Sequence, residues 1–427
     1  TMVGNGHLYL NGSDFADVNG SAVVGAPSYT VGGAIWNSAA AGADNLVASK
    51  HNAVTGDQTA VATKTISSLK LGANTLTLAS GATLTIRLGA AGTEGPLLQS
   101  GGSATITGGT AISAGGAGAL VIRVNGATDQ LTLGTPITTA TTGGWTKNGA
   151  GTLVFSVANT TTAGIGTINE GTVRLSGVGQ LGGASLNVTI RQGATLDLNG
   201  LNVTTGSFNG AGTVTNGSAT AVTLTTQGGD TVSFTGLVRD GVGVTNVTRT
   251  GSSGSGRWLG ANTYSGVTTL NLSAAKVWEV DTLANYGVAS TLGTGASVSN
   301  ASALVFTGAA DSGLVYVGTS SVSTDRLFTL NSATATTGGA YFANNSGNNS
   351  TVVFANTGAL GFGGNANSNA QILGLGGSST GDNYFGPLIG NSGGGVYATA
   401  VTKSGVGTWI LGNSANSYTG ATTVSAG

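Results

Sequence analysis

Few side chains in this sequence could carry out nucleophilic or acid–base chemistry. The 427 residues include two histidines, His7 and His51, and no cysteine. The chain therefore has almost none of the residues that catalysis by a Ser-His-Asp or Cys-His arrangement requires. His51 lies in the stretch SKHNAVTGD, six residues before Asp57. We interpret it as a loop histidine rather than a catalyst.

The closest useful pair of carboxylates is Glu279 and Asp281, in the stretch VWEVDTL. On a strand, residues at i and i+2 share a face, which would place this pair beside Trp258 or Trp278. Paired carboxylates can cleave a polysaccharide, because a general acid and a base must flank one glycosidic bond. The sequence leaves two alternatives open: a surface turn pair without a function, and the acid and base of a carbohydrate-active protein.

No pattern in the sequence predicts a metal or a cofactor. No calcium-binding D-x-[DN]-x-[DN]-G loop occurs, and no thiolate ligand exists. The glycine-rich stretches GGAGAL and GLGGSSTG lack the Lys-[ST] sequence that follows a phosphate-binding loop. We therefore expect no metal site and no cofactor, and we interpret Asp325 and Arg326 as a local ion pair.

The composition limits the partners of the chain. Charged residues make up 7% of the sequence, against about 25% in a typical soluble domain. The 14 Lys and Arg residues are scattered and the net charge is −1, so we expect no nucleic-acid partner and no anionic membrane surface. No apolar run is long enough to predict a transmembrane segment.

The strand pattern predicts an all-β protein. Short runs of alternating apolar and polar residues are bounded by Gly, Asn or Asp, as in 184–200, where Leu186, Val188 and Ile190 alternate with polar residues. We expect glycine at the corners and one buried face on each strand. Interior columns are predicted to tolerate no charge, so Asp at Val154 or Ile410 is predicted to destabilise the protein, while the pattern alone leaves open which of two neighbouring residues points inward. A 3.6-residue period competes with alternation in 274–287, which we interpret as a loop or a single turn.

Three segments of the chain resemble one another. They are TKNGAGTLVFSVANTTTAG from Thr146, TRTGSSGSGRWLGANTYSG from Thr248 and TKSGVGTWILGNSANSYTG from Thr402. Each has a basic residue after the threonine, a glycine-spaced turn, a short apolar strand and an Asn-containing turn. Internal repeats with unequal loops are typical of a solenoid, in which coils stack on their neighbours. We interpret the tryptophans beside the basic residues, Trp145, Trp258 and Trp409, as core residues rather than sugar-stacking ones.

This pattern resembles the autotransporter-associated β-strand repeat of bacterial passenger proteins. The resemblance implies a right-handed parallel β-helix that is extracellular or on the bacterial cell surface. We predict a less regular β segment, or the start of the solenoid, at 1–60. A continuous β-helix is predicted over 61–427, with repeat copies near 146–177, 248–272 and 402–427.

The scarcity of titratable groups and the repeated strands predict a non-enzymatic structural or adhesive protein, one form of which is the repeating body of an extracellular fibre. The alternatives are a polysaccharide lyase or hydrolase using Glu279 and Asp281, and a non-catalytic sugar-binding fibre. We expect the chain to associate end to end with copies of itself or to be tethered in a longer chain. Surface glycans are a further candidate partner.

Overall fold

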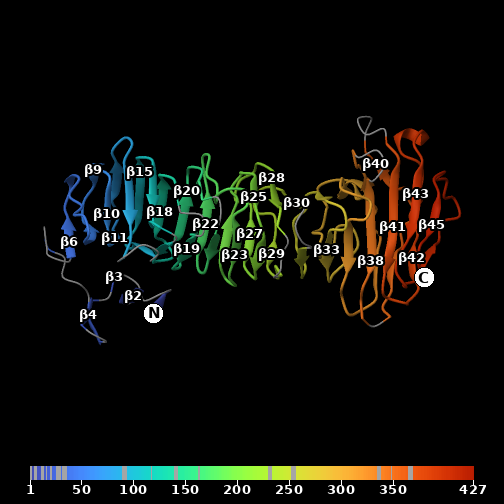
Figure 1. Ribbon diagram of the computed structural model, residues 1–427, viewed down its shortest axis with the longest axis horizontal. Helices are drawn as coiled ribbons and strands as arrows, with labels where there is room; N and C mark the ends of the chain where they lie inside the picture. The colour runs from blue at the N-terminus through green and yellow to red at the C-terminus, as the bar shows by residue number, and fades with distance from the viewer. Residues whose placement is uncertain are drawn as a thin grey trace. The chain divides into compact units, whose positions relative to one another are not determined.

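The computed structural model (Figure 1) describes residues 36–427 except 89–93, 117, 139–142, 162–163, 229–232, 252–255, 334–337, 348 and 364–368. Within the first 35 residues it describes 2–3, 7–10, 14–15, 17–19, 22–25 and 30. The chain divides into two compact units, Thr1–Leu201 and Asn202–Gly427. The predicted boundary at residue 60 and the continuity of 61–427 stay predictions.

Unit 1 contains three parallel sheets. One is formed by β6 (Trp36–Ala39), β8 (His51–Val54), β11 (Ser68–Leu71), β14 (Gly95–Gln99), β17 (Leu120–Val124), β19 (Trp145–Asn148), β21 (Ile165–Ile168) and β23 (Asn187–Ile190). The second is formed by β7 (Gly42–Ala43), β9 (Gln58–Val61), β12 (Thr75–Leu78), β15 (Ser103–Gly108), β18 (Gln130–Gly134), β20 (Thr152–Phe155), β22 (Thr172–Leu175) and β24 (Thr195–Asp197). The third is formed by β10 (Lys64–Ile66), β13 (Thr83–Ile86) and β16 (Ala111–Ser113).

Unit 1 begins with short antiparallel strands. They are β1 (Met2–Val3), β2 (His7–Leu10) and β3 (Asp14–Phe15), then β4 (Asp17–Asn19) and β5 (Ala22–Gly25). Phe15 packs with Leu98 and Trp36 on the outer face of the first parallel sheet. Asp14 pairs with Lys70 at 2.6 Å on the same face.

Unit 2 repeats the parallel arrangement. One sheet contains β25 (Val203–Thr205), β28 (Val222–Thr226), β30 (Thr245–Gly251), β32 (Thr268–Leu272), β34 (Leu304–Phe306), β37 (Thr329–Leu330) and β40 (Gly361–Phe362). A second contains β31 (Gly256–Trp258), β33 (Val277–Val280), β35 (Gly313–Tyr316), β38 (Gly339–Asn344), β41 (Gln371–Gly377), β43 (Thr399–Lys403) and β45 (Thr422–Val424). A third contains β36 (Val322–Thr324), β39 (Val352–Phe354), β42 (Asn383–Phe385) and β44 (Trp409–Leu411). Strands β27 (Thr213–Thr215) and β29 (Leu237–Val238) pair in parallel, and β26 (Phe208–Gly210) completes the strands.

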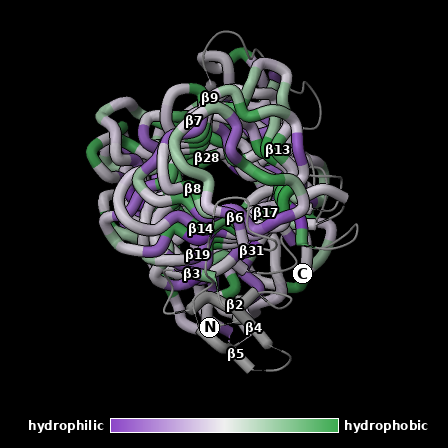
Figure 2. Tube along the Cα trace, turned by 90° about the vertical axis from the view of Figure 1, so that its left-hand side faces the viewer, coloured by the Kyte–Doolittle hydropathy of each residue, from purple (hydrophilic) through white to green (hydrophobic). Residues whose placement is uncertain are grey.

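The described residues contain no α-helix, and their only helical segments are the 3-10 turns η1 (Asn300–Ser302) and η2 (Gly393–Gly395). Strands that are neighbours in a parallel sheet are separated in sequence by strands of the other parallel sheets, which is the connectivity of a parallel β-helix. Figure 2 views unit 1 from the side of β6 and β9 and shows its coils winding around a shared interior. The predicted fold class is confirmed.

Alternation along the strands builds the core. The register stacks Leu76, Ile106, Leu133, Phe155 and Leu175 in one column, and each of these side chains is fully buried. Burying one such side chain contributes about 1.5–3 kcal/mol. The intervening residues face outward. The predicted alternation in 184–200 is confirmed, because Leu186, Val188 and Ile190 are fully buried.

The predicted tryptophans lie mainly in the core. Trp145 and Trp258 are fully buried, as is Trp278, whereas Trp409 is half-buried. The Trp258 ring contacts Phe234 at 5.2 Å and Trp278 at 5.4 Å between ring centroids. Core packing of Trp145 and Trp258 is therefore confirmed.

Glycine forms the corners where successive coils approach one another. Gly149 has φ +80°, and a Cβ atom there would lie 2.1 Å from the carbonyl oxygen of Val124 in the preceding coil. Only glycine satisfies both the left-handed backbone and this close approach. The predicted role of glycine at the corners is confirmed.

One of the two predicted interior positions, Ile410, is wrong. Ile410 is 42% exposed, and its register partner Tyr384 lies on the outer face of the sheet. Val154 is buried, but it pairs with Thr132 and Arg174 on the outer face, whereas Leu153 faces the core. The interpretation of 274–287 as a loop or turn is also wrong in part, because β33 occupies Val277–Val280.

Candidate functional site

The predicted acid–base pair is engaged in contacts between coils. Glu279 lies beside Arg257 on the neighbouring strand, with Oε2 3.5 Å from the arginine Nε. Asp281 follows β33, and its Oδ1 accepts hydrogen bonds from the backbone N–H of Gly260 at 2.8 Å and from Thr291 Oγ1 at 3.1 Å. Each carboxylate therefore has a partner within the protein, and neither position requires a bound substrate to account for it.

The tryptophans expected beside this pair lie on the other face of the sheet. Trp258 and Trp278 are fully buried in the core, whereas Glu279 is half-buried on the outer face. The inner and outer faces alternate along β33, so the rings do not form a platform beside the carboxylate. That part of the prediction is wrong.

His51 is not paired with Asp57. Its ring stacks on Trp36 with centroids 4.1 Å apart, and its Nδ1 lies 2.8 Å from Ser68 Oγ. Asp57 instead accepts a hydrogen bond from the backbone N–H of Thr75 at 2.8 Å. His51 begins β8 rather than lying in a loop, and the side chain of His7 falls outside the described residues.

Over the described ranges, no cluster of three or more His, Asp or Glu side chains could hold a metal ion. In the same part of the chain, no helix combines the length and apolar character needed to cross a bilayer.

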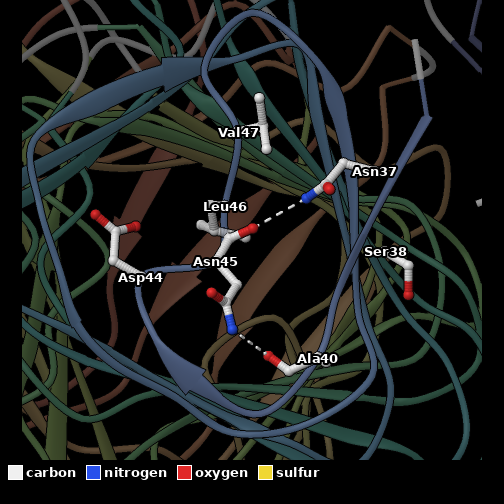
Figure 3. A pocket seen from close by; sticks show the side chains of 7 residues that line it. All are labelled: Asn37, Ser38, Ala40, Asp44, Asn45, Leu46 and Val47. Atoms are coloured by element: carbon white, nitrogen blue, oxygen red, sulfur yellow. Dashed lines mark hydrogen bonds between the residues drawn. The ribbon is translucent and has the colours of Figure 1, made fainter. Parts of the chain in front are cut away.

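A cavity of about 350 Å³ lies inside the first coil of unit 1 (Figure 3). It is lined by Asn37, Ser38, Ala40, Asp44, Asn45, Leu46 and Val47. Its polar groups bond to the protein itself: Asn37 Nδ2 donates to the carbonyl oxygen of Asn45 at 3.0 Å, and Asn45 Nδ2 donates to that of Ala40 at 3.0 Å. Asp44 forms an ion pair with Lys64. The cavity thus resembles a polar coil interior more than a ligand site.

Carboxylates hold neighbouring coils together. Asp129 accepts hydrogen bonds from the backbone N–H groups of Gly102 at 2.7 Å, Gly126 at 2.8 Å and Gly101 at 3.1 Å. Burial alone would raise the pKa of Asp129, but the three N–H donors stabilise its anion and hold the pKa below its usual value. Two of the donors belong to the preceding coil.

Asp240 makes the corresponding contact in unit 2. Its Oδ1 accepts from the backbone N–H of Thr245 at 2.7 Å, and its Oδ2 accepts from that of Ser265 in the following coil at 3.0 Å. Charge-assisted bonds of this kind are about twice as strong as neutral ones. The rare acidic residues therefore stabilise the stacking of coils.

The basic residues that recur in the three similar segments face the core. Lys147 occupies an inward column between Ile122 and Ile168 and is fully buried. Its Nζ donates to three backbone carbonyl oxygens at a corner. Burial lowers the pKa of Lys147 to about 7, opposed by the nearby carboxylate of Glu170. The prediction that interior columns tolerate no charge is wrong here, because the aliphatic stem follows the column and the amine reaches polar backbone at its edge.

Two buried arginines act similarly in unit 2. Arg249 donates to Thr226 Oγ1 at 2.6 Å and to the carbonyl oxygen of Gly228 at 3.2 Å, both in the preceding coil. Arg326 donates to the carbonyl oxygens of Ala284 at 2.9 Å, Val288 at 3.1 Å and Gly293 at 2.6 Å, and so holds a long loop against the coil.

The predicted ion pair between Asp325 and Arg326 does not form. The Asp325 carboxylate accepts a hydrogen bond from the backbone N–H of Tyr286 at 2.6 Å, while the Arg326 guanidinium points to the loop carbonyls. Burial lowers the pKa of Arg326, opposed by Tyr264, Asp325 and Tyr286.

The asparagines of the repeated A-N-[ST] turns connect neighbouring coils, a role that the Asn-containing turn of the repeat did not by itself assign to these residues. In each copy, Asn Oδ1 accepts a backbone N–H from the preceding coil: Asn159 from Ile137 at 2.9 Å, Asn262 from Val238 at 2.8 Å and Asn416 from Ile389 at 2.9 Å. Their recurrence after alanine in all three copies was the available signal.

Comparison with known proteins identifies the repeats. The family described as passenger-associated-transport-repeat matches residues 146–175 and 401–427, which are the first and third similar segments. The chain is similar to the adhesin BmaC autotransporter of Brucella suis biovar 1 (strain 1330), with 32% identity over 317 residues. The alignment covers 74% of this chain and 8% of that relative, so the chain spans a small part of the relative's length. No solved structure matches the chain.

Proposed function

Since this chain is an autotransporter passenger repeat protein of the bacterial cell surface, we propose that it is a non-enzymatic β-helix that contributes to adhesion. The observation that carries the proposal is the use of its scarce charged groups. Asp129, Asp240, Lys147 and Arg326 each bond to backbone groups of their own or a neighbouring coil. Side chains that bond to the backbone in this way stabilise the β-helix and do not act as catalytic groups.

The outward face supports a contact role. In unit 2 the register stacks Thr204, Thr225, Thr248 and Thr269 in an outward column of half-buried side chains. Such a face is uncharged and presents hydroxyl and methyl groups. The relative that the chain resembles is named an adhesin, which agrees with a contact role.

Adhesion is tested by comparing bacteria that carry the intact protein with a strain from which its coding sequence is deleted in frame. We expect the deletion strain to bind cultured mammalian cells less well, and the intact gene to restore binding. A second in-frame deletion of equal length elsewhere in the same polypeptide is the control for shortening. Unchanged binding after the first deletion would contradict an adhesive role for this part.

Catalysis is tested on a panel of neutral and acidic polysaccharides. We expect no cleavage by the native protein. Glycan cleavage that disappears in the Glu279→Gln variant would replace this proposal with the carbohydrate-active alternative.

A further inference from the structure

We propose that the lysine of the repeat is a register latch, a positioning residue that fixes where the following coil forms its corner. Lys147 Nζ donates to the carbonyl oxygens of Asn148 at 2.9 Å, Gly149 at 2.7 Å and Glu170 at 3.2 Å. The first two acceptors belong to its own corner, and the third belongs to the corner of the next coil. In its protonated form the amine has three N–H donors, so this set of three acceptors matches its full capacity.

The third copy repeats the same contact. Lys403 Nζ donates to the carbonyl oxygens of Ser404 at 3.2 Å, Gly405 at 2.8 Å and Ala426 at 3.0 Å. In both copies the acceptors lie one, two and 23 residues after the lysine. The same spacing at two distant places in the chain indicates a built contact rather than a chance one.

A glycine follows the distant acceptor in both copies. Gly171 has φ +65°, and a Cβ there would lie 2.5 Å from the carbonyl oxygen of Gly149. Gly427 has φ +95°, and a Cβ there would lie 2.8 Å from both Lys403 Nζ and the carbonyl oxygen of Gly405. Because Gly171 and Gly427 have no Cβ atom, the corners of successive coils can approach closely enough for one lysine amine to bond to both.

The second copy shows what changes without lysine. Arg249 occupies the corresponding position, but its guanidinium bonds to Thr226 and Gly228 of the preceding coil. A planar guanidinium presents its donors in a fork, which does not match three carbonyl groups around one point. This copy lies outside the residues that the repeat family matches.

The hydrophobic pattern alone leaves the register incompletely defined. Side chains alternate with a period of two, so a slip of one residue would turn the core residues outward, but a slip of two would keep every residue on its face. Lys147 distinguishes the native alignment from a two-residue slip, because a slip removes the carbonyl of Glu170 from its amine. The lysine contact therefore favours the native register over the two-residue slip, which the alternation of apolar and polar residues does not do.

The test uses disulfides as register reporters, since the native chain has no cysteine. Thr146 pairs with Thr167 across β19 and β21, so a Thr146→Cys/Thr167→Cys pair reports the native register. A Thr146→Cys/Ile165→Cys pair reports a two-residue slip, because in the native register those Cα atoms are about 8 Å apart, too far for a disulfide. Each pair is introduced into the otherwise intact protein, refolded and oxidised.

In the Lys147→Met background we expect the slip reporter to form disulfide at least about tenfold more often, equivalent to about 1.4 kcal/mol. Lys70→Met is the matched control, because Lys70 lies on the outer face of β11 and pairs with Asp14. Folded Lys147→Met protein that forms only the native disulfide would overturn the proposal, as would an equal rise in the control.

If the Lys147→Met protein does not fold, Lys403→Met is tested in its place. Thr402 pairs with Thr423, so Thr402→Cys/Thr423→Cys reports the native register and Thr402→Cys/Ala421→Cys reports the slip. The same tenfold rise is expected there, and its absence in the folded protein would refute the latch.

Discussion

Removal of the Asp129 carboxylate should destabilise unit 1 in a pH-dependent manner. The side chain is 8% exposed and accepts three backbone N–H groups, from Gly101, Gly102 and Gly126. Asp129→Ala would leave these donors without that acceptor. Asp129→Asn would keep one oxygen but place an amide N–H₂ group where the second oxygen accepts two of the bonds.

The expected magnitude follows from the bonds. Each hydrogen bond to a charged group contributes about 1.5–3 kcal/mol, and relaxation of the corner recovers part of the loss. We therefore expect the free energy of unfolding to fall by about 3–5 kcal/mol in Asp129→Ala and about 2–3 kcal/mol in Asp129→Asn. Urea unfolding followed by far-ultraviolet circular dichroism at pH 7 measures both, with Asp382→Asn, an exposed aspartate, as the control.

The pH dependence separates this mechanism from a packing effect. The pKa of Asp129 is lowered in the folded protein, so the unfolded state takes up a proton first as the pH falls. The stability that the carboxylate provides is present above its unfolded pKa, about 3.9, and is lost as the pH falls through its lower folded pKa. The difference between native and Asp129→Asn proteins should shrink below about pH 4. A difference that stays constant down to pH 2.5, or none at pH 7, would refute the reasoning.

The remaining predictions concern the core, the buried amine, the carboxylate pair and self-association. Leu153→Asp should destabilise by about 4 kcal/mol or more because Leu153 faces the core, whereas Thr132→Asp, at a half-buried position of the outer face, should cost about 1–2 kcal/mol; equal losses in thermal unfolding would contradict the assigned register. The pKa of Lys147 is lowered to about 7 in the folded protein, so between pH 7 and the usual lysine pKa of about 10.4 the unfolded state binds one more proton than the folded state. The free energy of unfolding should therefore rise with pH in this range, by up to about 1.4 kcal/mol per pH unit. If the Lys147→Met protein shows the same dependence of the free energy of unfolding on pH, the lowered pKa is contradicted. Glu279→Gln should change the free energy of unfolding by less than about 1 kcal/mol, since its ion pair with Arg257 is partly exposed to solvent, and a larger loss in urea unfolding would show a structural role. End-to-end association stays a prediction: filaments of this chain in negative-stain images would support it, and single rods of a longer chain would contradict it.

The sequence was sufficient to predict the fold class and most of the core. Alternation with β-branched residues and glycine at strand ends is a local signal, and it placed Leu186, Val188 and Ile190 correctly. The direction of Val154 and Ile410 was not predictable in this way, because both neighbours in each strand are apolar. Only the register with adjacent coils decides which of two such neighbours faces inward.

The candidate site was harder to predict because its side chains act on the backbone of distant residues. Lys147 was visible as a recurring basic residue, but its burial follows from carbonyl groups one, two and 23 residues later. Asp129 likewise gives no local sign that it bonds to Gly101 and Gly102. Motif patterns describe side chains near one another in sequence, whereas these contacts arise only when coils stack.

The stacking contacts also have a mechanical consequence. Within each unit, the hydrogen bonds of parallel strands run from one coil to the next, and the side-chain bonds of Asp129 and Asp240 span the same interval. Tension applied across a coil boundary would therefore load the strand bonds and the carboxylate bonds at the same time. Hydrogen bonds that are stretched at the same time require a larger force to break than bonds that break one after another. The carboxylates of Asp129 and Asp240 therefore raise the force needed to separate successive coils of a surface protein under shear.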